Sequence, residues 1–255
     1  MTRLLSGAVL AAAALAAILF LPLLGLRLLA CLVAALATRE YLGVVDTGRA
    51  VAMAPIVLVV VMACWWVSDP GRIVVLPVLL VGLAWLGAEV IFRGYTVDQA
   101  AVRFLAPWYI GMPLGMLAAV QALGGPRATL LLLATVVVSD SAQYYTGRAF
   151  GRRSLAPAIS PKKTVEGAVG GLVFGTGFLA AAGPWALPLA GRLSLGLLGA
   201  AIVSLGICGD LFESRLKRTA GVKDSAALIP GHGGVLDRID ALLFAVPAYY
   251  LYLRA

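Results

Sequence analysis

Residues 194–213 read SLGLLGAAIVSLGICGDLFE, an apolar run whose first charge, Asp210, comes near its end. A helix that crosses a bilayer needs about 20 such residues. The whole chain of 255 residues has the same character: it is 62% hydrophobic and only 13% charged, with a mean hydropathy of +0.98. A soluble domain is about 45–50% apolar and about 25% charged. This composition excludes an ordinary soluble protein, a disordered chain and an outer-membrane barrel, whose strands alternate apolar and polar residues.

We therefore predict an all-α fold, a polytopic integral membrane protein with about nine transmembrane helices. We expect residues 1–125 to form N-terminal membrane helices and residues 126–255 to form a C-terminal catalytic membrane region with two long polar connections, at about 147–164 and 214–236. The expected spans are 5–21, 23–38, 51–67, 73–92, 104–123, 128–146, 165–187, 194–213 and 237–253.

The net charge of +8 predicts orientation rather than binding to nucleic acid. Fourteen of the basic residues fall in the connections after the second, fourth, sixth and eighth expected spans, and six fall on the other side. Since Lys and Arg are enriched in cytoplasmic loops, both polar connections are expected to face the cytoplasm. Basic loops at a membrane also favour anionic lipids and phosphorylated substrates.

Acidic residues gather at the ends of several expected helices. Asp140 ends one apolar run, Asp210 and Glu213 end another, and Asp237 and Asp240 open the last. Anchoring of helix ends explains one or two such residues but not this concentration. Carboxylates brought together from separate helices repel one another unless cations neutralise them, and oxygen ligands of this kind suit Mg²⁺.

Basic and glycine-rich segments lie beside these acids. The run Ser160-Pro161-Lys162-Lys163-Thr164 indicates a helix start that could cradle a phosphate, although it lacks the order of a P-loop. His232, the only histidine, lies in the sequence PGHGG, whose glycines allow close approach to a ligand. Together with Lys217, Arg218 and Lys223, these features indicate phosphoryl or nucleotidyl transfer to a lipid.

Residues 214–240, SRLKRTAGVKDSAALIPGHGGVLDRID, resemble the signature of the phosphatidate cytidylyltransferase (CDP-diacylglycerol synthase) family. A second similar segment runs from Asp140 to Gly167, and Arg39-Glu40-Tyr41 resembles a weaker N-terminal feature. The similarity covers about residues 139–245. Ala142-Gln143 stands where many members have Gly-Ala, which indicates a divergent branch.

The resemblance implies that CTP and phosphatidate react to give CDP-diacylglycerol and pyrophosphate at a bacterial inner membrane, with the active site facing the cytoplasm. It implies Mg²⁺, together with a monovalent cation such as K⁺, held by Asp210 and Asp237. Membrane lipids are the expected surroundings, and a homodimer is left open. The other expected catalytic residues are Lys217, Asp224 and His232. Those expected to bind substrate or cofactor are Asp140, Ser160, Lys162, Lys163, Thr164, Arg218 and Lys223.

Two other classes stay open at this point. The nearer is another CTP-dependent lipid enzyme, such as a polyprenol kinase or a CDP synthase for ether lipids. The second is an ion-coupled transporter, because acids inside membrane helices also form ion pathways. A transporter would not need clustered Lys and Arg together with the glycine-rich histidine loop on the same side as the acids.

Overall fold

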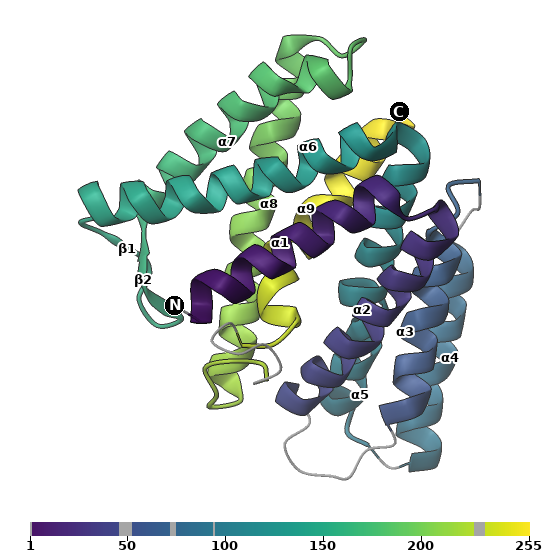
Figure 1. Cartoon of the computed structure of the whole chain (residues 1–255). Coiled ribbons are helices and arrows are strands. Elements are labelled where there is room, and N and C mark those ends of the chain that lie inside the picture. The colour runs from purple at the N-terminus through teal and green to yellow at the C-terminus, as the bar shows by residue number, and fades with distance from the viewer. Residues whose placement is uncertain (1, 46–52, 72–74, 94, 227–232) are drawn as a thin grey trace. The chain divides into compact units, whose positions relative to one another are not determined.

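The computed structural model describes residues 2–45, 53–71, 75–93, 95–226 and 233–255. The chain forms two compact units (Figure 1). The first comprises Met1–Ala122 and Asp224–Asp237, and the second comprises Leu123–Lys223 and Arg238–Ala255. The segment Asp224–Asp237, which directly precedes most of the C-terminal helix in the sequence, therefore belongs to the same unit as the N-terminal helices.

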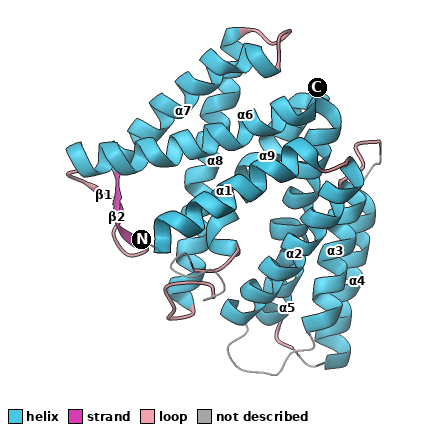
Figure 2. Cartoon of the chain, viewed as in Figure 1, coloured by secondary structure: helices cyan, strands magenta, loops and turns pink. Residues whose placement is uncertain are grey.

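The first unit is helical (Figure 2). It contains α1 (Thr2–Phe20), α2 (Leu23–Val45), α3 (Met53–Val67), α4 (Val75–Arg93), α5 (Val97–Ala106), the π-helical turn η1 (Pro107–Gly111) and the start of α6 (Met112–Phe150). α3 packs closely on η1 because Gly111 has no side chain: a methyl group there would lie 2.7 Å from the Val60 carbonyl oxygen. Tyr41 on α2 donates a 2.7 Å hydrogen bond to the Val102 carbonyl on α5. Close helix packing through small residues is typical of membrane proteins.

The second unit begins where α6 bends. Gly125 has a φ of 69° inside α6, a conformation that glycine adopts without a steric penalty. Pro126 follows it and lacks the N–H needed to continue the helical ladder. The rest of the unit consists of an antiparallel hairpin, β1 (Ser154–Ala156) and β2 (Ser160–Thr164), followed by α7 (Val165–Ala186), α8 (Arg192–Thr219) and the greater part of α9 (Leu236–Arg254).

Glycines also set the packing within the second unit. Gly167, Gly171 and Gly175 are spaced by four residues, so they share one face of α7. Added methyl groups there would lie 2.8 Å from the Gln143 carbonyl, 3.1 Å from the Ser139 carbonyl and 3.0 Å from the Ser139 Cβ atom. α7 therefore approaches α6 along a face without side chains, which sets how closely the hairpin between the two helices is held.

The predicted all-helical, membrane-type fold is confirmed, since four helical segments within the described part of the chain are long and apolar enough to cross a membrane. They are Leu23–Val45, Val97–Phe150, Val165–Ala186 and Arg192–Thr219. The expected count of nine spans stays a prediction. The two short strands were not expected, because they lie in a polar connection and long apolar runs identify only the membrane helices. The residue before a proline avoids helical geometry, which suits Ser160 to the start of a strand.

Candidate active site

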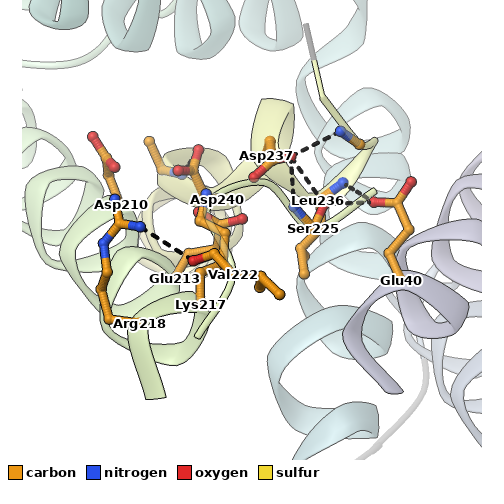
Figure 3. Close-up of polar contacts among 12 residues, drawn as sticks. Glu40, Asp210, Glu213, Lys217, Arg218, Val222, Ser225, Leu236, Asp237 and Asp240 are labelled. Carbon is orange, nitrogen blue, oxygen red and sulfur yellow. Dashed lines mark hydrogen bonds and ion pairs between the residues drawn. The ribbon is translucent and has the colours of Figure 1, made fainter. Parts of the chain in front are cut away.

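The first unit holds a cluster of polar contacts around Glu40, near the C-terminal end of α2 (Figure 3). Glu40 is only 9% exposed. Its carboxylate accepts hydrogen bonds from the backbone N–H of Val235 at 2.9 Å and of Leu236 at 2.8 Å, and from the Ser225 hydroxyl at 3.1 Å. The N–H groups that precede a helix's first turn have no partner in the helix itself, so Glu40 caps the start of α9.

Asp237 completes this cluster from within the first turn of α9. Its Oδ2 atom accepts hydrogen bonds from the Gly234 N–H at 2.8 Å, the Ser225 N–H at 3.0 Å and the Ser225 hydroxyl at 3.0 Å. Gly233 has a φ of 81°, and a methyl group on it would lie 2.5 Å from Asp237 Oδ2. The backbone at Gly233 therefore passes close to this carboxylate, an approach that a residue with a side chain would block.

The second unit holds a separate group of charged residues. Lys163, at the end of β2, forms an ion pair with Asp210 on α8, and both side chains are partly buried. Asp140 on α6 and Asp240 on α9 lie close enough for their charges to act on each other, on Asp210 and on Lys163. Three carboxylates thus lie near one ammonium group, which can neutralise only one of them.

α8 carries a second ion pair one turn beyond Asp210. Lys217 lies 2.5 Å from Glu213, whose side chain is only 1% exposed. Arg218 is directed differently: it donates to the Val222 carbonyl at 3.1 Å and to the Ile159 carbonyl in the hairpin at 3.4 Å. The basic end of α8 is therefore tied to the loop between β1 and β2.

The hairpin leads directly into α7, as the sequence predicted for this helix start. Thr164 is the N-cap of α7, and its hydroxyl accepts a 3.1 Å hydrogen bond from the Gly167 N–H. Glu166 accepts hydrogen bonds from the N–H groups of Arg152 and Arg153 at 3.0 and 3.3 Å. Lys163 is thus held beside the positive end of a capped helix, where anions are favoured.

Comparison with known proteins shows the family to which the chain belongs. The model of the cytidylyltransferase family matches residues 1–255, the whole chain. The chain belongs to the cytidylyltransferase family.

Curated relatives align with part of the chain. It is 43% identical over 166 residues to the uncharacterized protein YnbB of Escherichia coli, covering 64% of this chain and 53% of YnbB. It is 45% identical over 134 residues to the phosphatidate cytidylyltransferase of Pseudomonas aeruginosa (51% and 49% covered) and 38% identical over 166 residues to that of Bacillus subtilis (62% and 60% covered). These alignments span about half the length of the curated relatives.

The structure brings several of the predicted family residues together within each unit. Asp140, Lys163 and Asp210 meet in the second unit. Asp237 lies in the first unit with Asp224, whose Cβ atom would be 3.6 Å from a methyl group on Gly233. Ser160 is half-buried in β2, whereas Lys162, Arg218 and Lys223 are exposed. His232 lies outside the described residues.

Two acids gained importance only in the structure. The sequence indicates Glu40 only as part of a weak N-terminal feature, and it indicates Asp240 as a helix-end acid without assigning it to the site. A signal for Glu40 existed, because an acid within two residues of an expected membrane span is costly unless it is paired. Its partners, 185 to 196 residues away, follow from no local pattern.

The donor chemistry of the second unit fits a divalent cation. The carboxylates of Asp140, Asp210 and Asp240 leave negative charge that Lys163 offsets only in part. Among the described residues, no three His, Cys, Asp or Glu side chains converge closely enough to enclose a metal ion. Mg²⁺ is usually held by one or two carboxylates together with water and substrate phosphates, so it requires no enclosed protein site.

Proposed function

We propose that this chain is a phosphatidate cytidylyltransferase, which makes CDP-diacylglycerol and pyrophosphate from CTP and phosphatidate. The observation that carries the proposal is the group of Asp140, Asp210 and Asp240 around Lys163, on membrane helices and beside a capped helix start. Such a group suits a reaction between a lipid phosphate and a nucleoside triphosphate at a membrane. The names of the Pseudomonas and Bacillus relatives agree with this choice.

In the proposed reaction, a phosphate oxygen of the lipid attacks the α-phosphorus of CTP. The new P–O bond forms as the bond to the β-phosphate bridge breaks, and pyrophosphate leaves with the electron pair. The nucleophile is already an anion near neutral pH, so no strong general base is needed. Positioning of the two substrates and neutralisation of their charge are then expected to supply most of the rate.

The chain's own residues divide this work. Lys162, Lys163 and Thr164 bind a phosphate at the start of α7, with Ser160 in the strand that leads there. Lys217, Arg218 and Lys223 bind further phosphate charge from α8 and the segment after it. Asp224 and His232 contact the reacting groups from the loop before α9. Asp140 lies beside Asp210 and adds to the negative charge there.

Asp210 and Asp237 are the proposed ligands of Mg²⁺, with a monovalent cation such as K⁺ as a companion. Mg²⁺ supplies neutralisation of charge on the reacting phosphates. We place the site on the cytoplasmic face of a bacterial inner membrane, in a chain of nine spans, because the basic residues concentrate in the two polar connections.

The decisive experiment uses the purified full-length chain in detergent, with phosphatidate, Mg²⁺ and CTP labelled either at the α- or at the γ-phosphate. A cytidylyltransferase transfers the α-label to the lipid as CDP-diacylglycerol and releases the γ-label as pyrophosphate. A CTP-dependent lipid kinase would instead place the γ-label on the lipid. Absence of any labelled lipid, with reactions containing EDTA as the background, would refute both activities.

A further inference from the structure

Glu40, in the N-terminal half of the chain, contacts described residues on both sides of the loop that leads to the proposed metal ligand Asp237. All the residues concerned belong to the first unit. Glu40 lies on α2, and its partners lie in the segment 225–236. A buried carboxylate is costly unless donors satisfy it, and here both oxygens accept hydrogen bonds.

The two oxygens of Glu40 have distinct partners. Oε1 accepts from the Val235 N–H, whereas Oε2 accepts from the Leu236 N–H and from the Ser225 hydroxyl. Two successive backbone N–H groups are thus held by one side chain. This fixes the direction in which the chain enters α9, and therefore the direction of the first turn, which carries Asp237.

Ser225 links Glu40 to Asp237 directly. Its hydroxyl oxygen lies 3.1 Å from Glu40 Oε2 and 3.0 Å from Asp237 Oδ2. A serine hydroxyl has a single proton to donate, so it can satisfy only one of the two carboxylates at a time. The hydrogen bonding of Asp237 therefore depends on that of Glu40.

Gly234 packs tightly against the side chains of Glu40 and Ser225. Gly234 is buried, and a methyl group on it would lie 2.7 Å from Glu40 Cδ and still closer to Ser225 Oγ. Hydrogen bonds to charged acceptors are short and about twice as strong as neutral ones. The negative charge of Glu40 is also favoured at the N-terminus of α9 by the helix dipole.

We propose that Glu40 is a positioning residue, which orients the start of α9 at Val235 and Leu236 and, through Ser225, the carboxylate of Asp237 for the transfer reaction. The proposal rests on the function proposed above. Glu40 touches neither substrate nor reacting atoms in this role; it acts through Ser225 and the start of α9.

The first test measures the loop without using activity. In the full-length protein, Glu40→Gln retains size but replaces one acceptor oxygen with an amide donor. Amide hydrogen exchange of Val235 and Leu236 should then accelerate by about tenfold or more, since their N–H groups lose a charged acceptor. Glu166→Gln is the matched control: its carboxylate also accepts two backbone N–H groups, so only exchange near Arg152 and Arg153 should accelerate.

The second test measures the reaction. Glu40→Gln should lower kcat by about 10- to 100-fold, the scale of a small displacement of a reacting group, and should raise the Mg²⁺ concentration for half-maximal rate. KM for CTP should change by less than about twofold, because the lysines and the arginine proposed to bind its phosphates lie outside residues 225–236. Ser225→Ala removes only a hydroxyl, so it should fold and give the same pattern more weakly.

Each failure has a distinct appearance. If wild-type protein makes no CDP-diacylglycerol, the function proposed above is wrong, whatever Glu40 does. If wild type is active and Glu40→Gln leaves exchange of Val235 and Leu236 unchanged, Glu40 does not position the start of α9. If exchange accelerates while kcat and Mg²⁺ dependence match wild type, the tether is merely structural and the proposal is overturned.

Discussion

Carboxylates in this protein serve two different purposes. Glu40, Glu166 and Asp237 each accept hydrogen bonds from backbone N–H groups and so shape loops. Asp210 instead faces Lys163, near other acids. A carboxylate whose oxygens are saturated by N–H groups has less capacity for a cation than one facing a single ammonium group. Of the two proposed metal ligands, Asp210 therefore has more capacity for a cation than Asp237.

We expect Asp210→Asn and Asp237→Asn each to reduce turnover more than about 100-fold, because each removes a ligand charge beside crowded phosphates. Only Asp237→Asn should also accelerate hydrogen exchange at Ser225 and Gly234, since its Oδ2 accepts hydrogen bonds from both N–H groups. Steady-state kinetics and exchange on the same preparations check both statements. Near-normal turnover in either variant would remove that residue from the metal site.

Lys163→Ala should separate binding of substrate from binding of metal. Losing a charged partner of phosphate should weaken use of CTP by about 2–4 kcal/mol in kcat/KM. The same change removes the positive charge that competes for Asp210, so the Mg²⁺ concentration for half-maximal rate should fall. A Mg²⁺ titration at saturating CTP measures this. A rise in the Mg²⁺ requirement, as expected for the aspartate variants, would contradict the assignment.

At the scale of single elements, the glycine face of α7 decides how closely this helix meets its neighbours. Gly175 is buried, and a methyl group there would lie 2.6 Å from Val203 on α8 and 3.0 Å from Ser139 on α6. Gly177, two residues on, is exposed and has nothing within 4 Å of an added methyl group. Alanine variants at these two positions have the same composition, so a difference in their stability reports on packing alone.

Gly175→Ala should destabilise the protein by roughly 1–3 kcal/mol, the usual cost of overpacking a close contact. Gly177→Ala should leave stability unchanged or raise it slightly, because alanine is the better helix former by about 1 kcal/mol. Thermal unfolding of both variants in the same detergent gives the comparison. Equal midpoints would mean that α7 does not rely on this face.

The helices were predictable from the sequence, and the contacts that organise the site were predictable only in part. Long apolar runs indicate membrane helices without further information, and Gly125-Pro126 signals the bend in α6. Lys163 and Thr164 were expected at a helix start and are found there. The hairpin and the contacts of Glu40 were not foreseen, because they depend on residues distant in sequence or on loop geometry that has no period.

For the whole molecule, the positive-inside pattern makes a sided prediction. The free cysteines Cys31, Cys64 and Cys208 are first replaced, and single cysteines are then placed at exposed Lys162 and Lys223. Both should react with an impermeant thiol reagent only from the cytoplasmic side of sealed vesicles. Reaction of the two positions from opposite sides would exclude a shared active site.

The contact between Glu40 and residues 225–236 also has a consequence for how the protein is made. Those partners are 185 to 196 residues further along the chain. At a synthesis rate of about 5–20 residues per second, Glu40 leaves the ribosome roughly 10–40 seconds before them. During that interval the carboxylate of Glu40 lacks the three donors that satisfy it in the folded chain. A nascent chain stopped before residue 224 would therefore contain most of the helices, but Glu40 would still be without its hydrogen-bond donors.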